Sequence, residues 1–280
     1  MGTECGEQSV GTERRKGFRT GEDRQGHYGQ GRREDYHFRM FEAPDSPGTS
    51  PFLPAARRLR GLVFDLDGTL IDSVEDLRAA LNRLLAGRGR PPLERSAVQA
   101  MVGDGARKLV ERALTAAHGA APDVATLDPA LTAFLADYEA AAAVHTRAYP
   151  GVREVLTRLR GAGLKLAICT NKPYAASVAV LDALQLSDAF DAVIGGDSTP
   201  ARKPDPQPLQ AALDALGLPP GGAVMIGDGP HDALAAAAAG TGFIGVTYGY
   251  GTAGFAALTP APITIDRFAD LPARLGLTGG

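Results

Sequence analysis

From about residue 60 onward, short apolar runs alternate with stretches in which hydrophobic residues recur every three or four positions. The short runs predict buried strands and the longer spacing predicts helices. Strands are expected at 62–64, 164–169, 192–194, 223–226, 243–246 and 263–265, and helices at 152–161, 174–185, 206–216 and 232–239. Strands that alternate with helices predict an α/β fold built on a doubly wound parallel sheet.

A second region, residues 78–147, has helical spacing but no convincing strand. Leu77, Leu81 and Leu84 begin its pattern, and helices are expected at about 95–100, 106–117 and 129–143. Ser73 followed by Asp76 is typical of a capping box at the start of the first helix. We therefore predict a helical cap domain at 78–147, inserted into an α/β core at 56–77 and 148–280, with hinges where the chain crosses between the two.

Residues 1–55 differ from the rest of the chain. They are rich in Gly, Arg and Glu, with almost no apolar periodicity, and residues 1–50 carry eight Lys and Arg against nine Asp and Glu. Such a segment buries too little apolar surface to offset its ordering entropy, so we expect a disordered tail. A mitochondrial transit peptide would be poor in acidic residues, and Met40 is an alternative start.

Composition excludes several classes of protein. The net charge of −3 provides no basic field for nucleic acid, and no apolar stretch approaches the roughly 20 residues that span a bilayer. Two distant cysteines, Cys5 and Cys169, indicate neither a disulfide framework nor a zinc site. We expect a cytoplasmic protein, monomeric or a small homo-oligomer, with no membrane partner.

Two carboxylates close the first predicted strand, in the sequence Leu-Val-Phe-Asp-Leu-Asp-Gly-Thr at 62–69. Ligands of open α/β sheets bind beyond the carboxyl ends of the strands. Asp65 and Asp67 therefore indicate a site for a hard cation, or a nucleophile paired with an acid/base. The alternative is an ordinary turn, because Asp and Gly both favour turns.

Two more strand ends carry candidate phosphate-binding groups. Thr170 and Asn171 follow the strand at 164–169 directly, where they would bind phosphoryl oxygens or cap the next helix. Lys203 stands before a proline and a helix, a position that can direct an ammonium at phosphate. Its alternative is a solvated surface group.

The last candidate strand end has the sequence Gly-Asp-Gly-Pro-His-Asp at 227–232. Asp228 and Asp232 suit Mg²⁺, which takes few carboxylates and keeps several waters. Asp232 would otherwise be an acid at a helix N-terminus, and His231 is expected to be a loop residue. Taken together, the four strand ends provide the groups for phosphoryl transfer, in which positioning and electrostatics dominate.

These motifs resemble, in order, those of the haloacid dehalogenase superfamily, which has a Rossmann-like core. The resemblance covers about residues 60–272 and implies that Asp65 is a nucleophile forming an aspartyl-phosphate while Asp67 serves as acid and base. It also implies Mg²⁺ as cofactor, held by Asp65, the backbone carbonyl of Asp67 and Asp228, with Asp232 in support. Thr170, Asn171 and Lys203 would bind the phosphoryl oxygens.

One residue departs from the family pattern. Gly229 stands where many relatives carry Ser or Thr, so a supporting hydroxyl contact is in doubt, although the metal carboxylates are kept. An Asp at 67 favours a phosphatase over the dehalogenase members, which lack this second acid.

The region between the first two motifs bears on the substrate. Val-Gly-Asp-Gly-Ala at 102–106, together with Arg-Lys-Pro-Asp-Pro at 202–206, resembles bacterial phosphoglycolate phosphatases. The resemblance implies hydrolysis of 2-phosphoglycolate to glycolate and phosphate, with Gly103 and Gly105 near the substrate, and a role in salvage after DNA repair or in photorespiratory carbon metabolism. Gly103 and Gly105 would alternatively form a simple turn between helices.

Three other functions stay open. The first is another capped phosphatase of small metabolites, acting on a sugar phosphate or pyrophosphate, and the second is a sugar phosphomutase with the same nucleophile. The third is a non-catalytic binding module, which predicts damage to the acidic motifs. Asp65, Asp67, Lys203 and Asp228 are all present, and this speaks against the third function.

Overall fold

A computed structural model describes residues 59–141 and 143–277 of the 280-residue chain. The predicted tail at 1–55 and the alternative start at Met40 lie outside the described residues. Within the described part, no helix combines the length and apolar character needed to cross a bilayer.

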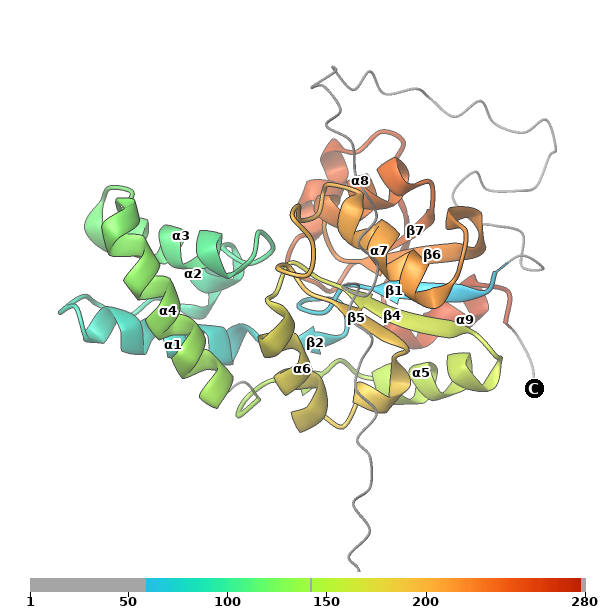
Figure 1. The fold of residues 1–280 in the computed structure, drawn as a ribbon, viewed down its shortest axis with the longest axis horizontal. Helices are drawn as coiled ribbons and strands as arrows, with labels where there is room; N and C mark the ends of the chain where they lie inside the picture. The colour runs from blue at the N-terminus through green and yellow to red at the C-terminus, as the bar shows by residue number, and fades with distance from the viewer. Residues whose placement is uncertain (1–58, 142, 278–280) are drawn as a thin grey trace, which may run out of the picture.

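Six parallel strands form the sheet of the core, in the order β5-β4-β1-β6-β7-β8 (Figure 1). Their bounds are β1 Gly61–Phe64, β4 Lys165–Cys169, β5 Ala192–Ile194, β6 Ala223–Gly227, β7 Gly242–Val246 and β8 Ile263–Ile265. All four residues of β1 are buried, as expected of the central strand of a sheet covered on both faces. The predicted α/β fold with a doubly wound parallel sheet is confirmed.

Alternate residues along the strands enter two separate hydrophobic clusters, one on each face of the sheet. Leu62 and Phe64 belong to the cluster covered by α5 (Val152–Gly161), α6 (Tyr174–Ala183) and α9 (Leu271–Arg274). Val63 belongs to the cluster covered by α7 (Gln207–Leu216) and α8 (Pro230–Ala239). Because side chains alternate in direction along a strand, short strands of Val, Ile, Leu and Ala suffice to fill both layers. Short 3₁₀ helices complete the loops, at Ser187–Ala189, Pro220–Gly222, Thr252–Ala257 and Phe268–Asp270.

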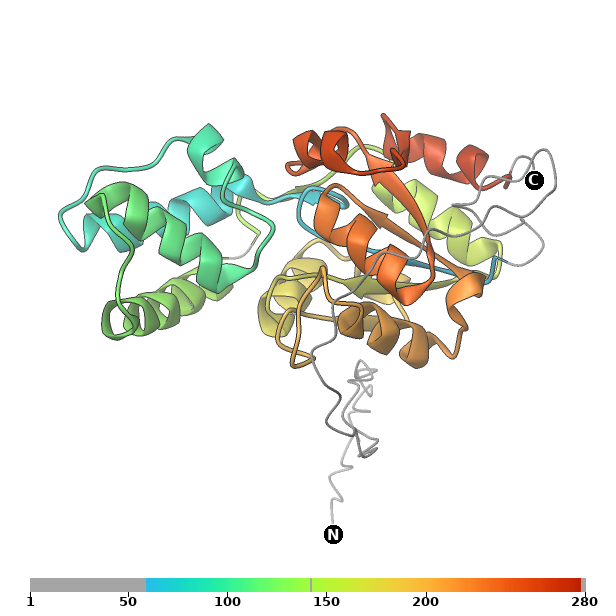
Figure 2. The ribbon, with the colours of Figure 1, turned by 90° about the horizontal axis from the view of Figure 1, so that it is seen from above.

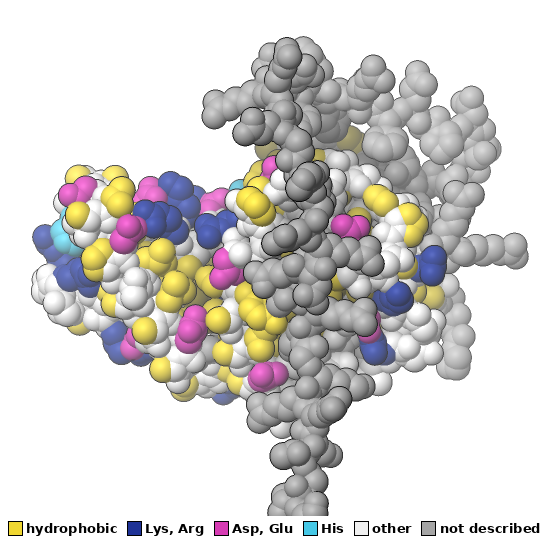
Figure 3. All heavy atoms as spheres, in the orientation of Figure 1, with side chains coloured by type: hydrophobic (Ala, Val, Ile, Leu, Met, Phe, Trp, Pro, Cys, Tyr) yellow, Lys and Arg dark blue, Asp and Glu magenta, His cyan; other side chains and the backbone are white. Residues whose placement is uncertain are grey.

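Four helices form a separate unit beside the sheet, which we call the helical unit (Figures 1 and 2). They are α1 Val74–Ala86, α2 Arg95–Gln99, α3 Ala106–His118 and α4 Val124–Ala140. The chain enters and leaves the unit through the antiparallel pair β2 (Ile71–Asp72) and β3 (Arg147–Ala148). The predicted boundary between residues 77 and 78 falls inside α1, which packs against α2, α3 and α4. Basic and acidic side chains are interspersed over the face of the unit seen in Figure 3.

Helix α4 begins five residues earlier than the sequence pattern predicts. The Asp123 carboxylate accepts a hydrogen bond from the Thr126 backbone N–H at 2.9 Å, and this N-cap starts the helix at Val124. Pro129 therefore lies inside the helix, whereas the prediction placed it at the first helical position.

The capping box predicted for Ser73 and Asp76 is wrong. Ser73 is the N-cap residue of α1 but makes no side-chain cap hydrogen bond, because its hydroxyl donates to Asp67 at 2.5 Å. The buried Asp76 carboxylate accepts hydrogen bonds from the His145 and Thr146 backbone N–H groups at 2.7–3.0 Å, and from the Thr146 hydroxyl at 2.7 Å. Asp76 therefore fastens the start of α1 to the segment that returns from the helical unit.

We expect Asp76→Ala to lower the free energy of unfolding by about 3 kcal/mol, because it leaves several buried donors without an acceptor. Urea unfolding followed by circular dichroism measures the change. The control is Asp137→Ala, which removes an exposed ion pair with Arg83 and should cost less than about 1 kcal/mol. Equal effects of the two substitutions would contradict a special role of Asp76 at the crossing.

Candidate active site

The loop after β1 places Asp65 and Asp67 at the carboxyl edge of the sheet. The Asp65 N–H donates to the Ile226 carbonyl at 2.9 Å, which continues the pairing of β1 with β6, and Leu66 then begins a tight turn that ends at Ile71. Gly68 has a φ of +86°, and a Cβ there would collide with the Asp228 carboxylate. The turn therefore needs a glycine for its backbone conformation and for the close approach of Asp228.

Lys203 is buried at the centre of the site. Its Nζ lies 2.8 Å from Asp65 Oδ1, 2.7 Å from Asp232 Oδ1 and 2.6 Å from the Cys169 carbonyl oxygen. These three acceptors match the three N–H donors of an ammonium. The alternative of a solvated surface lysine is therefore wrong. In this structure the ammonium neutralises the carboxylates of Asp65 and Asp232. A contact with a phosphoryl oxygen would replace one of its three hydrogen bonds.

The carboxylates of Asp228, in the turn after β6, and Asp232, in the first turn of α8, face Asp65. One Asp228 oxygen accepts hydrogen bonds from the backbone N–H groups of Tyr250 at 2.6 Å and Gly251 at 3.0 Å. Asp232 accepts from the Gly229 N–H at 3.2 Å and from Lys203, so it is both an acid at a helix N-terminus and part of the site. Oxygens of Asp65, Asp228 and Asp232 lie within 4.8 Å of one another.

Three neighbouring carboxylates with one ammonium leave an excess of negative charge. Burial raises the pKa of Asp65 to about 6, against the opposing effect of Lys203, and Asp232 adds to the rise. Burial and the charges of Asp65 and Asp232 raise the pKa of Asp228 to about 7. A divalent cation would relieve this repulsion, and an all-oxygen set of carboxylates fits a hard ion such as Mg²⁺. The residues present therefore fit the cation that the sequence resemblance implies.

Asn171 connects the Lys203 loop to the helical unit. Its side-chain amide donates to the carbonyl oxygens of Gly103 at 2.9 Å and Lys203 at 3.0 Å, and its Oδ1 accepts from the Lys203 N–H at 3.0 Å. The alternative that Thr170 and Asn171 cap the next helix is wrong, since α6 has Pro173 at its N-cap. The Thr170 hydroxyl instead accepts from the Lys172 N–H.

The Gly103–Gly105 loop lies against the core. Gly103 and Gly105 have φ values of +124° and +83°, and a Cβ on Gly105 would stand 2.9 Å from the Asn171 carbonyl oxygen. Between them, Asp104 bonds Arg112 of α3 and lies 3.0 Å from Nε2 of His231, in the first turn of α8. The expectation that His231 lies in a loop is wrong, because α8 begins at Pro230; His231 contacts the helical unit, and the carboxylate cluster found among the described residues does not include it.

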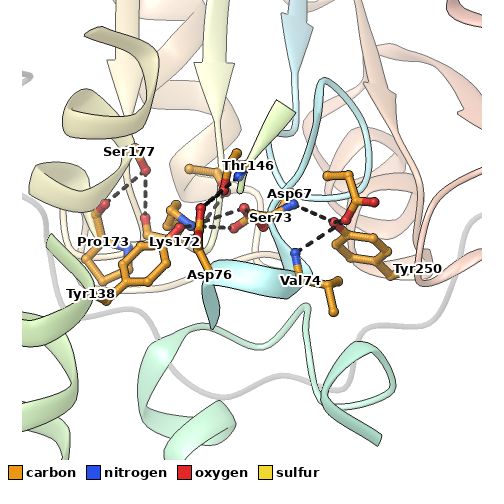
Figure 4. A network of polar contacts seen from close by, with 12 residues as sticks. Asp67, Ser73, Val74, Asp76, Tyr138, Thr146, Lys172, Pro173, Ser177 and Tyr250 are labelled. Atoms are coloured by element: carbon orange, nitrogen blue, oxygen red, sulfur yellow. Dashed lines mark hydrogen bonds and ion pairs between the residues drawn. The ribbon is translucent and has the colours of Figure 1, made fainter. Parts of the chain in front are cut away.

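Sequence reasoning missed Lys172. Its buried ammonium lies 3.1 Å from both carboxylate oxygens of Asp67 and 2.7 Å from the hydroxyl of Tyr138, a residue of α4 (Figure 4). Burial alone lowers the pKa of Lys172, but Asp67 and Tyr138 outweigh it and the net shift is upward. The only signal in the sequence was its place directly after Thr170-Asn171.

A cavity of about 230 Å³ lies between the core and the helical unit. The core lines it with the predicted site residues Asp65, Asp67, Thr170, Asn171, Lys203, Asp228 and Asp232. The helical unit contributes Gly103, Gly105 and an apolar wall that includes Leu109, Phe134 and Leu135. The structure therefore brings every predicted site residue to the lining of one cavity.

Comparison with known proteins agrees with this geometry. The family model of the haloacid dehalogenase-like hydrolases matches residues 59–240. The chain belongs to this family. A phosphoglycolate phosphatase of Caulobacter vibrioides is 45% identical over 75% of this chain and 88% of its own length. A phosphoglycolate phosphatase of Rhodospirillum rubrum is 42% identical over 78% of this chain and 91% of its own.

A solved structure also supports the family assignment. The crystal structure of a predicted phosphoglycolate phosphatase from Haemophilus somnus superposes with a TM-score of 0.72 at 32% identity, covering 79% of this chain and 99% of that one. The predicted superfamily and the predicted enzyme class, a phosphatase, are confirmed.

We expect the metal-free protein to lose stability as the pH rises from 5.5 to 8. Asp65 and Asp228 have raised pKa values in the folded state, so the native protein binds more protons than the unfolded chain across this range, and ∂ΔG_unfold/∂pH is negative. Asp228→Asn should reduce the fall in Tm between the two pH values by at least ~3 °C.

Thermal unfolding in a chelating buffer at the two pH values measures this effect. Asp214→Asn, at an exposed position of α7, is the matched control and should leave the pH dependence unchanged. An Asp228→Asn variant with the wild-type pH dependence would show that this carboxylate is not destabilised by its neighbours.

Proposed function

We propose that this protein is a Mg²⁺-dependent phosphatase that hydrolyses 2-phosphoglycolate to glycolate and phosphate. The observation that carries the proposal is the arrangement around Asp65. Its buried carboxylate is held by the Lys203 ammonium and faces Asp228. A second carboxylate, that of Asp67, follows two positions later in the chain. This arrangement supplies a fixed nucleophile and a separate proton carrier at one end of a cavity.

Asp65 attacks the phosphorus of the substrate and forms an aspartyl-phosphate, while the bond to the leaving oxygen breaks. Asp67 gives its proton to that oxygen, and glycolate departs. Asp67 then takes a proton from a water molecule that attacks the phosphorus, and this step releases phosphate and restores the Asp65 carboxylate. The Ser73 hydroxyl and Lys172 fix the Asp67 side chain from two sides for both transfers.

Mg²⁺ would be held by the carboxylates of Asp65 and Asp228 and the backbone carbonyl of Asp67, with Asp232 in support, and would supply positive charge against the phosphoryl oxygens. Thr170 and Asn171 would bind the same oxygens from the β4 side. Lys203 holds Asp65 in place through the 2.8 Å contact, and its contact with phosphate is part of the proposal.

Two observations support phosphoglycolate as the substrate. The cavity of about 230 Å³ suits a small metabolite rather than a macromolecule. The named bacterial relatives are phosphoglycolate phosphatases at 42–45% identity. Other capped phosphatases of small metabolites and sugar phosphomutases share the chemistry at Asp65, so the substrate must be decided by assay.

Asp65→Asn should lower kcat for phosphate release at least ~1,000-fold, because an amide cannot replace the carboxylate nucleophile. Phosphate release with Mg²⁺ measures the loss, and circular dichroism checks that the variant is folded. Asp188→Asn, at an exposed position of the α/β core domain, is the control and should retain wild-type activity. Substantial activity in Asp65→Asn would refute the mechanism.

Among small phosphoesters, 2-phosphoglycolate should have the highest kcat/KM, and removal of Mg²⁺ by EDTA should abolish release. A panel that includes glucose 6-phosphate, xylulose 5-phosphate and pyrophosphate gives the ranking. If sugar phosphates rank well above phosphoglycolate, the substrate proposal fails and the phosphatase mechanism stands. Isomerised sugar phosphate without free phosphate would instead identify a phosphomutase.

A further inference from the structure

Lys172 and Tyr138 form a polar pair on the wall of the cavity. The proposed mechanism assigns no role to the Tyr138 hydroxyl. Lys172 follows β4 in the core and Tyr138 lies on α4 in the helical unit, so the pair joins the two parts of the molecule. The ammonium also lies over the Tyr138 ring, 4.5 Å from its centroid. Both side chains are almost fully buried, with 6% and 2% of their surface exposed.

The hydrogen bonds of this pair leave one donor without an acceptor. The three N–H groups of the ammonium face three acceptor atoms, the two carboxylate oxygens of Asp67 and the phenol oxygen of Tyr138. Lysine can only donate, so the Tyr138 oxygen accepts, and among the described residues the hydroxyl proton of Tyr138 has no acceptor. A buried donor without an acceptor is costly, and here it lies beside an ammonium on the wall of a cavity.

The position of the pair relative to the reacting group indicates which part of a substrate it faces. Asp65 and Lys203 mark the phosphoryl end of the cavity, and Asp67 is the group that gives a proton to the leaving oxygen. Lys172 contacts that same Asp67 carboxylate at 3.1 Å. A group carried one or two atoms beyond the leaving oxygen would therefore lie next to Lys172 and under Tyr138.

We propose that Lys172 and Tyr138 form a binding site for a second anionic group, a carboxylate carried by the leaving alcohol, and thereby select the substrate. The inference rests on the proposed phosphatase function and assigns the residues that recognise the glycolate end. A carboxylate would accept hydrogen bonds from the ammonium and from the phenol. An uncharged alcohol of the same size would accept only neutral hydrogen bonds there and would not match the charge of the ammonium, so it would be bound less favourably.

A purely structural role is the competing explanation. Lys172 would then only hold Asp67 in place, and its loss would slow all substrates alike. The two roles differ in the ratio of kcat/KM for two substrates that differ only in charge. 2-Phosphoglycolate and 2-hydroxyethyl phosphate are such a pair, since a hydroxymethyl group replaces the carboxylate.

The experiment compares this ratio in the wild type, Lys172→Met and Tyr138→Phe, each with Mg²⁺. The wild type should prefer 2-phosphoglycolate at least ~30-fold, and Lys172→Met should remove most of that preference by losing kcat/KM on phosphoglycolate selectively. Lys172→Arg, which keeps the charge, should restore part of the ratio. Tyr138→Phe keeps the ring that packs on Phe134 and should lower the ratio about three- to tenfold.

Lys108→Met is the matched control, because Lys108 is an exposed lysine of α3 paired with Glu111. It should leave both rates and their ratio unchanged. If Lys172→Met does not fold, the Tyr138→Phe variant still tests the proposal.

Other outcomes would refute either the anion site or the proposed substrate. If Lys172→Met slows both substrates equally, or if the wild type uses both equally well, the anion site is refuted and the phosphatase function stands. If the wild type releases phosphate from neither substrate but does so from other phosphoesters, the proposed substrate is refuted, and the assignment of Lys172 falls with it.

Discussion

Mutual repulsion of the carboxylates at the ends of β1 and β6 is the constraint on which the rest of the site depends. Asp65, Asp228 and Asp232 come within 4.8 Å of one another in a largely buried place, where like charges raise each other's pKa. The Lys203 ammonium offsets part of this repulsion by bonding two of the three. The parallel sheet makes the arrangement possible, because neighbouring strands deliver their loops to the same edge.

Two buried lysines divide the carboxylates of the site into two groups. Lys203 pairs with Asp65 and Asp232, and Lys172 pairs with Asp67. Breaking a buried pair leaves an uncompensated charge, so each lysine fixes the position of its partner. Only the second pair touches the helical unit, through Tyr138. Asp65 and its ion-pair partner therefore lie within the core, whereas the contacts of the Asp67–Lys172 pair involve both parts of the molecule.

The sequence was most informative where its pattern reflects burial. The six strands and their flanking helices were predictable because apolar runs of three to six residues have few other uses in a chain of this composition. The four motifs were predictable because polar side chains directly after such runs must lie at the edge of the sheet. Lys172 was not, since nothing local distinguishes it from a solvated lysine. Its buried partner Tyr138 lies 34 residues away in the sequence, on the helical unit.

The errors at the crossing between core and helical unit have the same origin. Ser73 and Asp76 have the spacing of a capping box, and local rules alone predict one. The fold offers each a partner that local sequence does not contain, Asp67 for Ser73 and the returning segment at 145–146 for Asp76. Tyr250 adds a further link, since its N–H donates to Asp228 and its hydroxyl bonds Asp72. Side chains that local rules assign to a helix cap thus join the crossing to the site carboxylate Asp67 and to the returning segment, so the same few residues link the position of the helical unit to the geometry of the site.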